Sequence, residues 1–223
     1  ETGFNLAFPQ GVDVPQNYQL NFPTLVRAGV LNPVELRVGT ALLGIGRSGP
    51  GTSTDVGAVD TILGMKTQFA SNHGWVPDAA FSFDIGLPTG DDAFSAGTAT
   101  VDGRFLFSWA LGEGFVLLTN LGAATTPVGE RRLVEEVHVI NLGFGPEWLD
   151  RRVGVFVEHF GKVLLQEPSA SADEDRVRAM QADWGAWWMI TPDFQVDFFF
   201  QNELRGSGGT PLQASVGLSG RIR

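Results

Sequence analysis

Apolar and polar residues alternate one by one along most of this 223-residue sequence. In residues 80–87, for example, Phe81 and Phe83 occupy alternate positions, with Ser82 and Asp84 on the positions between. Successive side chains of a β-strand point to opposite faces, so the pattern predicts strands whose two faces meet different environments. The same alternation recurs at residues 34–42, 104–111, 194–201 and 212–222, and helical spacing is not sustained anywhere.

Turn-forming residues divide the chain into twelve expected strands. We place these strands at residues 3–8, 16–30, 34–46, 56–70, 78–88, 98–111, 114–125, 134–147, 151–165, 178–190, 194–204 and 212–222. Short or medium turns are expected at 31–33, 71–76, 112–113, 149–150 and 191–193, and longer loops at 10–15, 47–54, 89–96, 126–133, 166–177 and 205–211. Tight turns on one rim and loops on the other are typical of an up-and-down barrel that crosses a membrane.

Alternation alone does not say which face lies inside. A soluble sandwich or barrel points its apolar face inward, whereas a membrane barrel points it outward to lipid. Four features favour the membrane barrel: small residues on the polar face, charges of both signs there, strands longer than the usual five or six residues, and tryptophans near strand ends. The tryptophans expected in aromatic girdles are Trp75, Trp148, Trp184, Trp187 and Trp188.

We therefore expect an all-β protein with a single domain, residues 1–223, folded as a closed antiparallel up-and-down transmembrane β-barrel of about twelve strands. Closure is expected because an open sheet edge in lipid leaves backbone groups without hydrogen bonds, at a cost of several kcal/mol each. The expected location is the outer membrane of a Gram-negative bacterium, as a mature chain without a signal peptide.

Composition narrows the classes of function. The formal net charge of −10 argues against a nucleic-acid partner, which needs a basic face. The chain has no cysteine and three histidines, so we expect no metal site and no cofactor. A catalytic triad is also not indicated, since neither His138 nor His159 has a serine two residues along on the same face.

Five short motifs resemble a known family over about residues 24–222. They lie at residues 25–29, 34–39, 55–66, 87–92 and 191–197. Their order and spacing are similar to those of bacterial outer-membrane barrels assigned to transport in the MetA pathway of phenol degradation. The resemblance implies an outer-membrane barrel that passes small molecules, with hydrophobic or aromatic compounds as candidates. The chain departs from outer-membrane strands in general at its C-terminus, which ends in Arg223 rather than in an aromatic residue.

The expected function is thus passive passage of small solutes through the barrel. Six charged residues of the polar face are predicted to line the pathway: Arg37, Lys66, Asp84, Arg104, Asp183 and Asp197. The alternative is that these charges pair with one another and simply fill the barrel. A structural barrel that anchors partner subunits of a larger outer-membrane assembly is a second hypothesis, and an outer-membrane enzyme is a third, less favoured one.

Two acidic segments on expected loops have two interpretations. Asp91–Asp92 and residues 173–175 carry carboxylates that suit calcium or the cations that bridge lipopolysaccharide. A solvated turn or acidic loop is the favoured interpretation, and residues 88–91 have the composition of a turn. Outer-membrane lipids and lipopolysaccharide are the expected surroundings of the barrel.

Overall fold

The computed structural model describes residues 2–8, 18–47, 54–71, 74–128, 131–165, 178–205 and 212–221. These residues form an all-β protein with one antiparallel sheet of thirteen strands. The strands are β1 (Thr2–Phe8), β2 (Tyr18–Leu31), β3 (Val34–Arg47), β4 (Asp55–Gly57), β5 (Thr61–Ala70), β6 (Asp78–Leu87), β7 (Thr100–Gly112), β8 (Phe115–Val128), β9 (Arg131–Phe144), β10 (Val153–Leu164), β11 (Arg178–Thr191), β12 (Phe194–Arg205) and β13 (Leu212–Gly220). The described residues also contain a 3-10 turn, η1 (Glu147–Leu149), which follows β9, and no helix among them is long and apolar enough to span a membrane.

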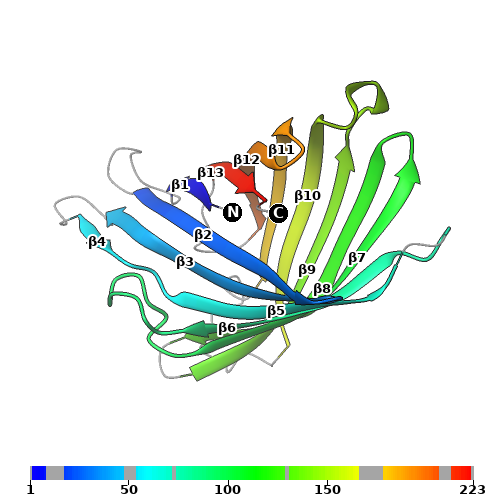
Figure 1. Ribbon diagram of the computed structural model, residues 1–223. Coiled ribbons are helices and arrows are strands. Elements are labelled where there is room, and N and C mark those ends of the chain that lie inside the picture. The colour runs from blue at the N-terminus through cyan, green and yellow to red at the C-terminus, as the bar shows by residue number, and fades with distance from the viewer. Residues whose placement is uncertain are drawn as a thin grey trace.

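The sheet follows the order of the sequence, so neighbouring strands are joined up and down. From β5 to β13 each strand pairs with the next along the chain, and β3 pairs with β2, β4 and β5. The two ends of the chain also meet, because β1 pairs with β13 from Thr2 opposite Leu218 to Phe8 opposite Leu212. Figure 1 shows the sheet strongly curved, with the N- and C-termini side by side.

The predicted strands agree closely with the observed ones, with one division that was not expected. The strand expected at residues 56–70 is split into β4 and β5, both of which pair with β3. The link between them, residues 58–60, leaves β3 and hydrogen-bonds instead to the β6–β7 connection, where Ala58 N donates to the Asp91 carboxylate. The backbone of residues 58–60 therefore has other hydrogen-bond partners than β3, and these interrupt a strand that the alternation predicted to be continuous.

The prediction of a long loop at residues 126–133 is wrong. Strand β8 runs to Val128 and β9 begins at Arg131, with Val128 opposite Arg131 in the ladder. The β-branched Thr125, Thr126 and Val128 favour extended backbone, so this hairpin continues where composition suggested a loop. The expected loops at 10–15 and 166–177 lie outside the described residues.

The two faces of the sheet differ in the way the alternation predicts. Large apolar side chains on one face, which we call the outer face, are extensively exposed; examples are Phe105 at 49%, Leu121 at 52% and Phe198 at 48%. The opposite, inner face carries the polar positions, such as Arg37 and Asp84, and lines the cavity described below. In the described residues the buried apolar side chains are Ala79, Ala80, Val137 and Val139, so the sheet has no large apolar core.

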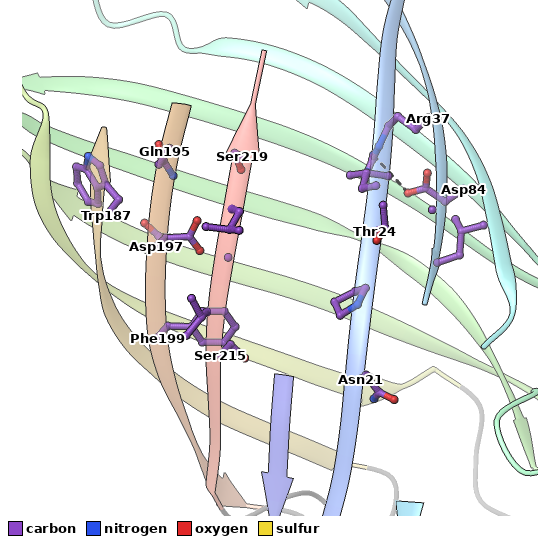
Figure 2. A pocket seen from close by; sticks show the side chains of 18 of the residues that line it. Asn21, Thr24, Arg37, Asp84, Trp187, Gln195, Asp197, Phe199, Ser215 and Ser219 are labelled. Atoms are coloured by element: carbon purple, nitrogen blue, oxygen red, sulfur yellow. Dashed lines mark ion pairs between the residues drawn. The ribbon is translucent and has the colours of Figure 1, made fainter. Parts of the chain in front are cut away.

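Three of the five tryptophans expected in girdles are exposed near strand ends or turns: Trp75, Trp148 and Trp188. Trp184 is also exposed on the outer face of β11, but it lies in the middle of that strand, six residues from Arg178 and seven from Thr191. Trp187 was predicted with them but lies on the inner face, where it lines the cavity (Figure 2). Its position in the strand decides this, because Trp187 is an even number of residues from Asp183 and an odd number from Trp184.

Candidate functional site: a charged and aromatic cavity on the inner face

A cavity of about 1080 Å³ lies against the inner face of the sheet. Strands from both ends of the sequence line it, including β2, β3, β12 and β13. Figure 2 shows Arg37 and Asp84 on one side, with Trp187, Asp197 and Phe199 across from them. Because side chains alternate along each strand, all of these residues lie on the same face of the sheet. The curvature of the sheet, rather than a local motif, then brings them around one cavity.

Arg37 and Asp84 form an ion pair that spans three strands. Arg37 on β3 is opposite Gly64 on β5, and Gly64 is opposite Asp84 on β6. Arg37 Nη1 lies 3.4 Å from Asp84 Oδ2 and donates a hydrogen bond of 2.7 Å to Ser82 Oγ. Because the middle residue has no side chain, charges on β3 and β6 reach one another directly above it.

A smaller pocket of about 310 Å³ adjoins this pair, and its lining is rich in basic residues. Arg27, Arg37, Lys66 and Arg104 all line it. Arg104 also binds the Asp102 carboxylate with two nitrogens, one of them Nε at 2.7 Å from Oδ1. We call this side of the inner face, on β2 to β7, the basic wall.

The opposite side of the inner face, on β10 to β12, carries acidic residues and is called the acidic wall here. Glu158, Asp183, Asp197 and Glu203 occupy inner positions on these strands. Glu158 accepts a hydrogen bond of 3.0 Å from Asn141, whereas Oδ1 of the 92%-buried Asp183 has no hydrogen-bond partner. No ion pair or hydrogen bond of the Asp197 carboxylate is found in the described part of the chain.

Aromatic side chains cover the acidic wall. A Cβ added at Gly154 would lie 2.1 Å from Trp187 Cζ2, so the indole lies directly on β10, and Trp187 Nε1 donates to the carbonyl of Arg151 at 3.5 Å. Phe156 and Phe199 both approach Gly185 of β11 and line the cavity. The sequence prediction missed these rings, although glycines on the polar faces of neighbouring strands were a usable signal that something bulky lies there.

The six predicted pathway residues all lie on inner positions, but they do not form one group. Arg37, Asp84 and Arg104 line both pockets, Lys66 lines the smaller pocket and Asp197 the larger one. Asp183 lines neither pocket. The alternative, in which charges of the inner face pair with one another, holds for Arg37 with Asp84 and for Arg104 with Asp102, which is not one of the six residues.

The other candidates lie elsewhere. Asp91 hydrogen-bonds within the fold, residues 173–175 are outside the described residues, and the described part of the chain contains no group of three acidic, histidine or cysteine side chains that could hold a metal ion. His138 and His159 lie on the outer face, where His138 is opposite Leu121, and therefore do not face the cavity.

The fold and cavity define a curved up-and-down β-sheet protein with a charged interior, and comparison with known proteins gives its family. The family described as "Putative MetA-pathway of phenol degradation" matches residues 4–215, so the chain belongs to it. This confirms the resemblance drawn from the sequence motifs.

Two solved structures are similar in fold. One is the COG4313 outer membrane channel from Pseudomonas putida F1, with a TM-score of 0.67, 14% identity, and coverage of 98% of this chain and 94% of that chain. The other is the NanC porin, with a TM-score of 0.66, 9% identity, and coverage of 100% of both chains. At such low identity the likeness is one of fold alone, and no curated protein is similar enough in sequence to match.

Proposed function

We propose that the sheet closes into a transmembrane barrel of twelve strands, with β4 and β5 as two parts of one interrupted strand. The pairings support this, because each of β1–β3 and β5–β13 has a neighbour on both sides, and the series returns from β13 to β1 and from β1 to β2. In such a closed series each of these twelve strands has both edges paired, as a lipid environment requires.

The observation that carries the membrane assignment is the exposed apolar outer face. Side chains such as Phe105, Ile140 and Phe198 are about half exposed, while the inner face carries charged residues such as Arg37, Asp84 and Asp197. Apolar surface in water costs about 25 cal/mol per Å², whereas lipid solvates it at no such cost. Together with the family membership, this supports the outer membrane of a Gram-negative bacterium, with its lipids and lipopolysaccharide around the barrel.

Within this barrel we propose passive passage of small molecules, including hydrophobic or aromatic ones. The cavity supports this because it combines the aromatic rings of Phe156, Trp187 and Phe199 with charges on both walls. We assign the pathway to the inner face and keep the six predicted residues as its lining: Arg37, Lys66, Asp84, Arg104, Asp183 and Asp197. The role is transport rather than catalysis.

Solute flux through the purified, refolded protein in lipid vesicles tests this function. Small aromatic acids and neutral phenols should enter faster than into empty vesicles, and a Leu118→Trp variant should slow them because Leu118 lines the cavity. Leu121→Trp is the matched control, since Leu121 lies on the outer face of the same strand β8. Flux equal to that of empty vesicles, or equal slowing by both variants, contradicts the proposal.

A structural role in a larger outer-membrane assembly is the second candidate. Glu136, His138 and His159 interrupt the apolar outer face, with His138 Nδ1 at 3.6 Å from a Glu136 carboxylate oxygen and the two imidazole rings 5.5 Å apart. Polar groups facing lipid are unfavourable, so a partner subunit covering β9 and β10 would relieve the cost. Absence of flux together with a partner that co-purifies in fixed proportion would favour this role over the channel.

A further inference from the structure

Residues 88–99 connect β6 to β7. They are hydrogen-bonded to residues 58–60, the link between β4 and β5. The carboxylate of Asp60, in the link, accepts hydrogen bonds from Gly90 N at 2.9 Å and from Ala96 N at 2.8 Å. These bonds join residues thirty or more positions apart in sequence. One carboxylate thereby fixes both ends of the connection.

In a second set of hydrogen bonds the acceptor side chains belong to the connection, and the donors are backbone groups in or next to the link. Asp91 Oδ2, in the connection, accepts from Ala58 N at 2.7 Å, and Asp91 N donates to Ala58 O at 2.9 Å. Thr89 Oγ1 accepts from Thr61 N at 3.0 Å. Bonds to a carboxylate are about twice as strong as bonds between neutral groups, so Asp60 and Asp91 are the main attachments.

The connection also places an aromatic ring on the inner face of β3. A Cβ added at Gly44 would lie 2.7 Å from the Phe94 ring, and one added at Gly46 would lie 3.6 Å from it. Gly44 is an inner position, because the same added Cβ would lie 3.3 Å from Asn21 Oδ1, and Asn21 lines the cavity. The ring of Phe94 therefore lies inside the curve of the sheet.

The link itself projects into the cavity. Val59 and Asp60 line it, and Thr40 on β3 donates a hydrogen bond of 3.3 Å to the carbonyl of Val59. A strand that continued straight from β5 into β4 would leave this space open. The link lines the cavity, and the Phe94 ring lies beside it over Gly44, although Phe94 itself lines neither pocket. The hydrogen bonds join the link and the connection that carries this ring into one unit at this side of the inner face.

We propose that residues 88–99 form a constriction element of the pathway, in which Asp60 and Asp91 are positioning residues and Phe94 limits the width of the passage. The constriction rests on the proposed channel function. The docking of residues 88–99 onto residues 58–60 does not depend on that function and is tested separately. Removal of either carboxylate should release the connection, and removal of the ring should widen the passage without releasing it.

Docking is tested without any transport measurement, through a spin label on the connection. The chain has no cysteine, so Ala93→Cys gives a single labelling site, and Ala93 is exposed. Asp60→Asn and Asp91→Asn should each raise the mobile fraction of the label about tenfold, as expected from loss of one charge-assisted hydrogen bond. Asp92→Asn is the matched control, because it removes the same charge from an exposed side chain in the same connection. Equal mobility in all four proteins overturns the docking claim.

The width of the passage is tested by single-channel conductance in planar bilayers. Phe94→Ala should raise the main conductance while leaving the label on residue 93 immobile, whereas Asp60→Asn should add a second, wider level that Asp92→Asn lacks. Unchanged conductance in Phe94→Ala, in a protein that conducts, overturns the constriction. A protein that shows the mobility changes but conducts no current retains the docked connection and contradicts the channel function instead.

Discussion

Arg37 and Asp84 form an ion pair at 3.4 Å across the intervening strand β5, above Gly64. A Cβ added at Gly64 would lie 1.8 Å from Asp84 Oδ1, so any side chain there displaces the carboxylate from its place. Gly64, a glycine of the polar face, therefore leaves the space in which charged side chains two strands apart contact one another.

Gly64→Ala should destabilise the protein by about 1–3 kcal/mol, the range for overpacking at a close contact. The reason is that Asp84 must move off β5, which leaves Arg37 without its partner. Urea titration of the refolded protein in detergent or lipid measures the change. Gly29→Ala is the control, because a Cβ at Gly29 has no atom within 4 Å, and a similar loss in both variants would contradict the explanation.

Asp183→Asn should leave stability unchanged or increase it by about 0.5–1 kcal/mol. Asp183 lies directly opposite Glu158 in the β10–β11 ladder, and like charges in that arrangement repel. An amide relieves the repulsion and donates hydrogen bonds to the neighbouring carboxylate. The same titration on Asp84→Asn should show a loss, since that change removes the partner of Arg37. A marked loss for Asp183→Asn would show that its carboxylate has a favourable contact.

Two leucines of β8 test which face meets lipid. Leu121 is 52% exposed on the outer face, whereas Leu118 lines the cavity. Arginine in place of Leu121 should cost about 2–4 kcal/mol, because a charge at mid-bilayer must be solvated by lipid. Arginine in place of Leu118 should cost much less, since it enters a charged interior. Heat-modifiable migration of the folded form measures both, and equal effects would count against the membrane orientation.

The two walls should act oppositely on ion selectivity. Neutralising Arg104 in an Arg104→Gln variant leaves Asp102 without its partner, so the cation preference should rise about two- to threefold. Asp197→Asn removes an unpaired charge from the acidic wall and should lower the cation preference by a similar factor. Reversal potentials in a salt gradient give both values. Changes of the same sign in the two variants would remove these residues from the pathway.

The sequence alone predicted the all-β class, most strand positions and the faces of most residues in the alternating segments. Phe83 and Asp84 illustrate why: adjacent residues in a strand must point to opposite faces, so the alternation of apolar and polar residues already separates the outer face from the inner one. The family was also recognisable, because its motifs are short segments in a fixed order. These properties depend on local backbone geometry, which needs no knowledge of distant contacts.

The tertiary structure decided what distant residues do to one another. Whether Arg104 pairs with Asp84 or Asp102, whether Trp187 faces lipid or the cavity, and whether residues 58–60 continue a strand depend on register and on partners far along the chain. A shift of one residue in a strand reverses the face of every side chain, and a carboxylate such as Asp91, which binds Ala58 N, can take backbone groups away from a ladder. Alternation determines the faces of each strand, and register together with hydrogen bonds between distant segments determines the site.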